Sequence, residues 1–524
     1  MILVNSNVDT NAQFERKKVR SLKALLINPA TPTTFWSFGP VLKLLGKKAT
    51  LPPLGLLTVA ALLPSQWQLE VVDREFEQVK ESQWTEADLV FITGMTVQYE
   101  DIIKTIHEAH QRGKKVVIGG AWVYHYPEDA LREGADIVVV GEAEATMPEI
   151  LEAIAQGLTG VVIRAQAMAD LEKSPVPRYD LIDITAYLNV SIQFSRGCPF
   201  ECEFCDVTHM LGHKVRTKSP KQIVAELQSL YDLGYRHYIF LADDNFVGSF
   251  RKTKALLGEM IPWLGAHGNP YGFYTQASVN LATDDELLDL MVEAGFFKVF
   301  LGIETLDEET LMRTKKSQNT KVDLVEVCRK INEAGLGIIA GCILGFDYEP
   351  SDAGDRLQKF ARLTGIPEMF VTLLQAGPGT DLWNRLAKED RLLTRDYRNF
   401  SNQTSPMNFN PTRPMEKITE EFTSLYNSLY DRRHYLDRVA THILRMKPLA
   451  RRKSFQFPKK FEIKGLFAVI IRHGILYSTR FVFWRNLLKI ILNNPTQLVR
   501  FFDYSIGCEH YHAYAKVIEK AHRR

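Results

Sequence analysis

Residues 194–206 read FSRGCPFECEFCD and place Cys198, Cys202 and Cys205 within eight positions. The motif has the spacing C-x3-C-x2-C and follows directly on a short strand-like run at 191–195. Iron–sulfur clusters are held by thiolates, and a cubane cluster normally takes four of them. Three cysteines therefore leave one iron open, and an open iron can chelate the amino and carboxylate groups of a methionine moiety.

The same three cysteines are also compatible with a zinc site. A nearby histidine, such as His209 or His213, would complete a closed tetrahedral site. A further alternative is that the cysteines are buried by coincidence. We favour the cluster, because the uncommon spacing has a chemical purpose only when one iron stays open.

The cysteine motif begins a series of six strand-like runs with helical patterns between them. The runs lie at 191–195, 237–241, 272–276, 298–303, 338–343 and 370–374. Six β/α units predict a partial, open (β/α)6 barrel over residues 188–415. A parallel barrel carries its chemistry at the carboxyl ends of its strands, and the motif stands at the end of the first strand.

Upstream of the barrel, five short β-branched runs alternate with helix-length segments. The runs lie at 23–28, 69–73, 89–93, 115–119 and 136–140, and two predicted helices lie at 53–63 and 99–112. Apolar strands alternating with helices predict a parallel, doubly wound α/β sheet at residues 21–160. We treat residues 1–20 as a polar tail and residues 161–187, with Pro175 and Pro177, as a linker.

Doubly wound sheets bind ligands at the carboxyl ends of their strands. Several residues that follow these strands are candidates for binding a bulky cofactor, and paired glycines permit its close approach. The candidates are Asp73, Glu75, Thr93, Thr96, Gly119, Gly120, Gly141 and Glu142. The first turn lacks a Gly-x-Gly-x-x-Gly fingerprint, which argues against a dinucleotide.

The composition of the chain, 45% apolar and 24% charged over 524 residues, is that of a globular protein with two or three domains. The polar amino terminus does not resemble a signal peptide, so we expect a cytoplasmic protein. The cysteine pattern does not suit a secreted disulfide framework. Cys328 and Cys342 lie in apolar stretches and are expected to be buried, and Cys508 has no assigned role.

The net charge of +2 conceals a basic carboxyl terminus. Residues 432–524 hold twenty Lys/Arg and five Asp/Glu, and we expect 416–524 to form a mainly helical, basic domain. Within it, the apolar segment 464–502 is interrupted by cations too often to span a membrane. It could lie on an anionic lipid surface, or it could be a helical cap packed on the barrel. Nucleic-acid binding is not expected, because no nucleic-acid module is recognisable.

The barrel half of the chain resembles the radical S-adenosylmethionine (SAM) superfamily. The resemblance rests on the cysteine spacing, on Arg196–Gly197, on the aromatic Phe204 before the third cysteine and on the β/α repeat. It implies a [4Fe–4S] cluster on the three cysteines. It also implies roles in SAM binding: Phe204 beside the adenine, Asp243 and Asp244 (in LADDNF) at the methionyl amino group, Glu304 (in GIET) at the ribose and Gly341 (in GIIAGCILGF) under the adenine.

The amino-terminal half resembles cobalamin-binding domains, as PPLGL (52–56) and GEAE (141–144) indicate. One departure concerns the lower cobalt ligand. Such domains place a histidine two residues after the aspartate, whereas here Glu75 follows Asp73, and glutamate is a poor ligand for soft cobalt. Either the domain holds cobalamin without a protein imidazole, or it has kept only the fold.

Together these resemblances imply a cobalamin-dependent radical methyltransferase. The segments 39–64 and 197–208 and the basic, aromatic tail are most similar to the hopanoid C-2 methylase branch. We therefore expect methylation of an unactivated carbon on a small molecule or a hopanoid-like lipid, with a flavodoxin or ferredoxin as reductant. Contact with the inner face of a membrane is also expected. The alternatives are a radical cyclase or oxidase without methyl transfer, and a non-enzymatic corrinoid carrier.

Overall fold

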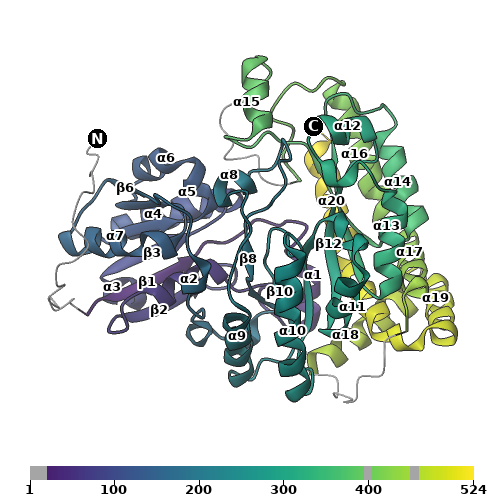
Figure 1. Ribbon diagram of the computed structural model, residues 1–524, viewed down its shortest axis with the longest axis horizontal. Coiled ribbons are helices and arrows are strands. Elements are labelled where there is room, and N and C mark those ends of the chain that lie inside the picture. Colours follow the sequence, from purple (N-terminus) through teal and green to yellow (C-terminus); the bar gives the residue numbers. More distant parts are fainter. Residues whose placement is uncertain (1–20, 395–402, 449–459, 524) are drawn as a thin grey trace.

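The amino-terminal part of the chain is a parallel, six-stranded sheet (Figure 1). The computed structural model describes residues 21–394, 403–448 and 460–523, so the predicted tail at 1–20 lies outside it. The strand order is β2-β1-β3-β4-β5-β6, with β1 Lys23–Asn28, β2 Gln68–Asp73, β3 Leu89–Thr93, β4 Lys115–Gly119, β5 Ile137–Val140 and β6 Val161–Arg164. The order switches between β1 and β3, which is where doubly wound sheets bind ligands.

Helices cover both faces of this sheet, because successive apolar residues of its strands point to opposite faces. On β1, Leu25 and Ile27 pack towards one set of helices, and Ala24 and Leu26 pack towards the other. The first set is α3 Glu81–Glu86, α4 Tyr99–Gln111, α5 Ala121–His125 and α6 Pro127–Arg132, and the second is α2 Leu54–Leu62 and α7 Ala143–Gln156. The predicted doubly wound α/β fold is confirmed.

The sheet has one strand more than predicted. β6 pairs with β5 inside the range 161–187 that we treat as a linker. Its side chains are half-buried or exposed, which is typical of an edge strand. A run of only four residues is too short to be recognised as a strand from sequence.

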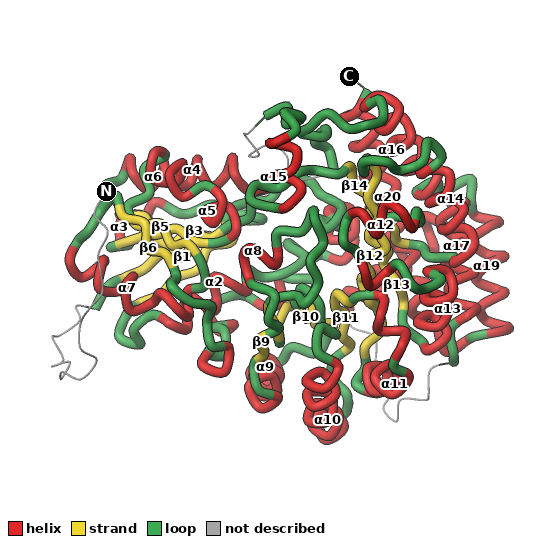
Figure 2. Tube along the Cα trace, turned by 45° about the horizontal axis from the view of Figure 1, so that its top comes forward, coloured by secondary structure: helices red, strands yellow, loops and turns green. Residues whose placement is uncertain are grey.

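A second parallel sheet, again of six strands, carries the cysteine motif after its first strand. Its strands are β7 Val190–Ile192, β10 Tyr238–Leu241, β11 Gly272–Ala277, β12 Phe296–Glu304, β13 Gly337–Leu344 and β14 Glu368–Leu373, in chain order across the sheet. Figure 2 shows the helices around it: α9 Pro220–Asp232, α10 Phe250–Ala266, α11 Asp285–Glu293, α13 Leu324–Ala334 and α14 Ala353–Thr364. β7 and β14 form the two edges, so the predicted partial (β/α)6 barrel is confirmed and is open.

Shorter elements occupy the connections between these units. They are α1 Gly39–Leu45, α8 Val207–Leu211, α12 Glu308–Arg313, α15 Asp381–Lys388 and the antiparallel pair β8 Ser195–Arg196 and β9 Arg216–Thr217. α8 and the β8–β9 pair flank the cysteine motif, and α15 packs against it through a backbone bond from Leu382 N to Glu203 O.

The carboxyl-terminal part is helical, as predicted, and it covers the open edge of the barrel at β14. Its helices are α16 Met415–Leu429, α17 Arg432–Arg445, α18 Lys460–Ile471, α19 Arg480–Asn493 and α20 Leu498–His522. Tyr430, which follows α16 directly, and Tyr426 of α16 donate hydroxyl hydrogen bonds to the carbonyl oxygens of Met369 (2.6 Å) and Val371 (3.1 Å) on β14. An edge strand exposes unpaired polar groups, and these tyrosines satisfy two of them.

Most of α20 packs inward, where Tyr511 and Tyr514 are fully buried. Within the segment 464–502, α19 buries one apolar face, with Phe483 and Ile490 fully buried, as the interpretation of this segment as a packed helical cap requires. Cys328, Cys342 and Cys508 are buried, as expected for the first two. Within the described ranges, no helix combines the length and the apolar character that crossing a membrane requires.

Candidate active site

The cysteine motif lies in a loop that follows β7 and β8 at the carboxyl end of the barrel. Gly197 starts this loop with φ +90°, a left-handed conformation that favours glycine. A Cβ atom at this position would lie 2.8 Å from the carbonyl oxygens of both Gly212 and Lys214. Glycine therefore allows the backbone to pass close to residues 212–214 before it reaches the cysteines.

The three thiols are half-buried. The charge of Cys202 raises the pKa of both neighbouring thiols, Cys198 and Cys205, in addition to the larger effect of burial. Burial raises the pKa of Cys205 to about 12. Thiolates are disfavoured in this loop unless a positive centre neutralises them, which is what binding to iron does. The thiols thus fit a cluster.

The described residues contain no group of three or more His, Cys, Asp or Glu side chains that could hold one metal ion. His209 and His213, which the zinc alternative requires, are exposed. An iron–sulfur cluster binds each thiolate through a different iron, so its ligands lie farther apart than those of a single ion.

Three polar side chains surround the thiols and were not recognised in the sequence. Asn245 directs its amide nitrogen at Cys198 Sγ (4.0 Å), and Gln318 directs its own at Cys202 Sγ (3.8 Å). Lys316 is buried, pairs with Glu304 Oε1 at 2.6 Å and has its pKa raised by Glu304 and by Cys202, against the opposing effect of burial. Hydrogen-bond donors and a cation beside the sulfurs would stabilise a negatively charged cluster.

The structure separates the two aspartates predicted to contact SAM. Asp243 is fully buried and accepts hydrogen bonds from the backbone of Phe194 (3.3 Å) and from the backbone and hydroxyl of Ser195. Asp244 is held less tightly, through a bond from Gly197 N (3.3 Å). Asp243 therefore anchors the strand that enters the cluster loop, and Asp244 is the better candidate for a ligand contact.

Glu304 and Gly341 lie on neighbouring strands, β12 and β13. Glu304 has φ +62°, a strained conformation for a residue with a side chain, at an irregularity in the pairing of β12 with β13. Such strain is concentrated at functional sites. Gly341 is buried, and a Cβ atom there would lie 2.5 Å from the ring of Phe300. The glycine thus admits an aromatic ring of the barrel wall.

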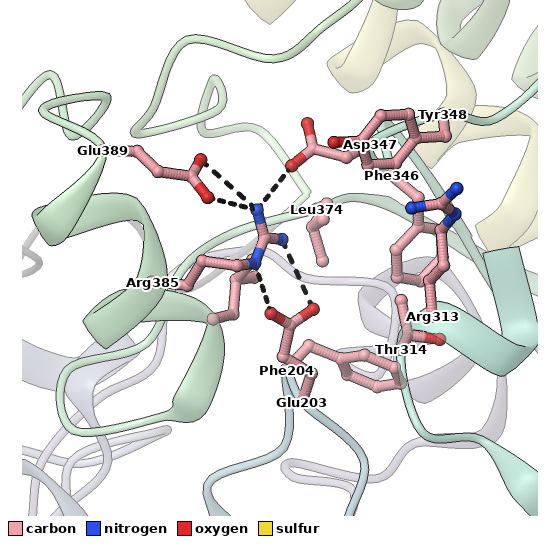
Figure 3. A pocket seen from close by; sticks show the side chains of 11 residues that line it. Glu203, Phe204, Arg313, Thr314, Phe346, Asp347, Tyr348, Leu374, Arg385 and Glu389 are labelled. Atoms are coloured by element: carbon pink, nitrogen blue, oxygen red, sulfur yellow. Dashed lines mark hydrogen bonds and ion pairs between the residues drawn. The ribbon is translucent and has the colours of Figure 1, made fainter.

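A pocket with a cavity volume of about 240 Å³ opens beside Phe204 (Figure 3). Phe204 and Phe346 meet edge to face at 5.6 Å on its apolar side. On the opposite side, Arg385 of α15 bonds to Glu203 Oε1 (2.5 Å) and Asp347 Oδ2 (2.9 Å). The predicted adenine contact Phe204 therefore lines a cavity of which one wall is aromatic and the other is ionic.

The predicted cobalamin residues lie along the carboxyl edge of the first sheet. At its switch point, Glu75 accepts from Thr31 N (2.9 Å), and buried Asp73 accepts from Asn28 (2.8 Å) and Tyr187 (2.8 Å). These bonds tie the loop after β1 to the loop after β2. They also engage both carboxylates predicted to meet the cofactor.

Glycines shape the remainder of this edge. Gly120 follows Gly119 with φ +98°, and a Cβ atom on it would lie 2.8 Å from Thr93 Oγ1. Gly141 has φ +113°, and Thr96 stands in the turn after β3. Gly120 and Gly141 are exposed, so at these two positions the edge presents backbone without a side chain. Such an edge suits a broad, planar cofactor.

Glu142 has a different position from the one we predicted for a cofactor ligand. Its carboxylate is buried and joins the two domains, because it accepts from Arg196 Nη1 (2.8 Å) and from Arg216 Nη1 (2.8 Å). Glu144 also bonds to Arg196, through Nη2 at 2.8 Å. We call Glu142, Glu144, Arg196 and Arg216 the interdomain bridge. Since Arg196 stands two residues before Cys198, the bridge fixes the cluster loop against the first domain.

The fold and site together define a class: a radical enzyme whose three-cysteine loop faces a corrinoid-type sheet. Three family models match successive parts of the chain, and they describe a B12 binding domain (47–151), the radical SAM superfamily (192–361) and a domain of unknown function, DUF4070 (380–524).

Curated relatives share most of the chain. An uncharacterized methyltransferase of Synechocystis sp. is 45% identical over 95% of this chain and 93% of its own. The hopanoid C-2 methylase of Rhodopseudomonas palustris is 33% identical over 72% of each. The chain therefore belongs to the cobalamin-dependent radical SAM methyltransferases, and it uses a [4Fe–4S] cluster, SAM and cobalamin.

Solved structures share this fold. TsrM from Kitasatospora setae, a radical SAM methyltransferase with cobalamin and a [4Fe–4S] cluster bound, has a TM-score of 0.56 at 19% identity and covers 71% of this chain and 78% of its own. OxsB, a cobalamin-dependent SAM radical enzyme, has a TM-score of 0.60 at 14% identity and covers 96% and 81%. The predicted three-part fold and cofactors are confirmed, and the comparisons do not favour a cyclase, an oxidase or a carrier.

Proposed function

We propose that this methyltransferase acts on an unactivated carbon of an apolar, polycyclic lipid of the hopanoid type. The supporting observation is the wall of the barrel, where buried Ile239 and Leu241 of β10 alternate with half-buried side chains that face away from the outer helices. Many of these half-buried side chains are aromatic. They include Phe240, Tyr274, Phe300 and Phe370.

These rings form contacts with one another along the inner wall. Phe240 stacks on Tyr274 at 4.9 Å, and Phe300 meets Phe370 at 6.1 Å. Trp36, from the loop after β1 of the first domain, lies 5.3 Å from Phe370 and is 40% exposed. Aromatic side chains left partly exposed between two cofactor domains supply apolar contact area for a substrate without charge. The 33% identical relative named hopanoid C-2 methylase supports the same substrate class.

The residues of this chain would hold and orient the cofactors. Cys198, Cys202 and Cys205 would ligate the cluster, the pocket at Phe204 would receive the adenine of SAM, and the open edge at Gly120 would receive cobalamin without a protein imidazole. When bound, the cluster supplies the electron that cleaves SAM, and cobalamin supplies the methyl group. The interdomain bridge holds the cluster loop against the first domain and so fixes the position of the cluster ligands relative to the open edge.

The roles of individual SAM contacts form part of the proposal. Asp244 would meet the methionyl amino group, with Asp243 positioning the strand behind it. Glu304, held by Lys316, would accept from the ribose hydroxyls, and Gly341 would keep the wall under the adenine shallow. The reductant would be a small electron carrier such as a flavodoxin or a ferredoxin.

The substrate assignment is tested with anaerobically reconstituted enzyme, reductant, a hopanoid and SAM labelled with deuterium in its methyl group. We expect the label in the lipid fraction by mass spectrometry. Trp36→Ala should raise KM for the lipid about tenfold or more, because the lost ring removes a substantial apolar contact. It should leave SAM cleavage in the absence of lipid unchanged.

The matched control is Trp263→Ala, which removes a half-buried tryptophan from α10 outside the barrel. It should leave KM for the lipid unchanged. A labelled product confined to polar molecules would contradict the lipid assignment, and so would an equal rise in KM for both variants.

A further inference from the structure

Exposed apolar side chains are concentrated on one short stretch of the carboxyl-terminal helices. Of twenty-two large hydrophobic residues exposed in the described parts of the chain, eleven lie between residues 463 and 492. They belong to α18, to the π-helical turn η7 (Arg472–Leu476) and to α19. Phe481 is 73% exposed and Leu492 is 71% exposed. Soluble proteins rarely expose such a concentration of apolar surface unless it binds a partner.

On α19 the exposed apolar residues form a stripe along the helix. Their positions follow the i, i+3, i+7 periodicity of one helical face: Phe481, Trp484, Leu488, Ile491 and Leu492. The opposite face is also apolar and is buried against the rest of the protein, through Val482, Phe483, Leu487 and Ile490. The buried apolar face attaches α19 to the rest of the protein, and the second apolar face is exposed.

Cations flank this stripe on both sides. At 100° per residue, Arg480 lies along one border, and Arg485 and Lys489 lie along the other. All three are exposed, and Arg485 pairs with Asp437 of α17. Residues 463–499 hold five Lys/Arg and no Asp or Glu. An apolar stripe bordered by cations is the pattern of a helix that lies in the interface of an anionic membrane.

The indole of Trp484 is held in place at the join between η7 and α19. Its Nε1 donates to the carbonyl oxygen of Gly474 at 2.8 Å, and its ring packs against Gly474, which has no side chain to obstruct it. The ring is nevertheless 45% exposed. A tryptophan with a bonded nitrogen and an exposed apolar edge suits the boundary between lipid head groups and acyl chains.

We propose that α18, η7 and α19 form a docking surface for an anionic phospholipid bilayer, with the apolar stripe inserted and the cations at the head groups. A second copy of this chain fits poorly, because a twofold interface would place the cations of one copy against those of the other. The proposal does not depend on the identity of the substrate. It would place the enzyme where membrane lipids are available.

The test is flotation of the full-length, anaerobically purified enzyme with vesicles of phosphatidylcholine, with and without phosphatidylglycerol. We expect binding to the anionic vesicles and weaker binding at high salt. The double variant Leu488→Glu/Leu492→Glu should bind at least about 30-fold more weakly, since it removes two inserted side chains. Arg480→Gln/Lys489→Gln should lose about fivefold per cation, and only on anionic vesicles.

The matched control is Leu158→Glu/Leu233→Glu, which places the same charges on exposed leucines 39% and 41% accessible in other parts of the chain. It should bind as the wild type does. All variants should still cleave SAM, which separates failure of this surface from failure of the active site. Three results would overturn the proposal: no binding to anionic vesicles, an equal loss in the control, or a dimer that Leu488→Glu/Leu492→Glu dissociates without any vesicle binding.

Discussion

Replacing Glu142 with alanine tests whether the interdomain bridge joins the two cofactor domains. The Glu142 side chain is 6% exposed, and its partners Arg196 and Arg216 are 14% and 13% exposed. A third bond, from Ala169 N to Glu142 Oε2 at 2.8 Å, would be lost as well. Truncating one partner of a buried ion pair costs about 3–5 kcal/mol, because it leaves a buried charge without compensation.

The structure places this substitution at the lower end of that range. Arg196 would keep Glu144 at 2.8 Å, and Arg216 would keep the carbonyl oxygens of Ala169 (2.8 Å) and Leu211 (3.0 Å). We therefore expect Glu142→Ala to lower the free energy of unfolding by about 3 kcal/mol. With a urea m-value of about 3 kcal/mol/M, the midpoint would fall by about 1 M.

The assay is equilibrium urea unfolding followed by tryptophan fluorescence, read in the transition in which the two domains separate. The matched control is Glu152→Ala on α7, an exposed glutamate that accepts a hydrogen bond from Gln156 in the same helix. It should change the free energy of unfolding by less than about 0.5 kcal/mol. If Glu142→Ala shifts the midpoint no more than Glu152→Ala does, the bridge does not stabilise the domain contact.

Two further predictions concern the cluster loop. Lys316→Gln should lower the midpoint potential of the bound cluster by on the order of 50 mV, because it removes a buried cation whose charge acts on Cys202. The control Lys315→Gln, at an exposed neighbouring residue, should shift the midpoint potential by less than half as much. Equal shifts for the two variants in a redox titration would contradict the prediction. Burial raises the pKa of Asp243 to about 7, so its contribution to stability is complete below about pH 4 and is lost as pH rises through 7. The stability difference between wild type and Asp243→Asn should therefore decrease from pH 5 to pH 8, and a constant difference in urea unfolding would argue against it.

Local patterns predicted most of the fold. The apolar runs identified the strands of the barrel and five of the six strands in the first sheet, because buried parallel strands are continuous in sequence. The thiol spacing identified the cluster loop, because its three cysteines lie within eight consecutive positions of the sequence. β6 was missed because an edge strand of only four residues is too short to stand out in the sequence.

The contacts between domains could not be predicted. Glu142 follows a strand of the first sheet, like the other cofactor candidates, yet it bonds to Arg196, 54 residues later in the chain. Lys316 and Gln318 reach the thiols from a polar segment more than a hundred residues after Cys202, with no periodicity to single them out. Only the fold brings such residues together.

The sequence of α19 is apolar on both faces, which left two interpretations of the carboxyl terminus open. The structure shows that Phe483 and Ile490 pack inward while Phe481 and Leu488 are exposed. Both faces of α19 are apolar, and the periodicity of the sequence does not indicate which face the rest of the protein covers.

The most direct test of the central claim is the formation of 5′-deoxyadenosine from SAM by anaerobically reconstituted enzyme with dithionite. Wild-type enzyme should form it, and Cys202→Ala should form none while it still carries corrinoid, because the thiols and the cofactor edge lie in separate domains. Cys328→Ser, at a buried cysteine outside the cluster loop, is the matched control and should still form 5′-deoxyadenosine. Nucleoside formation by Cys202→Ala at the wild-type rate, or none from wild-type enzyme with a full cluster, would contradict the assignment.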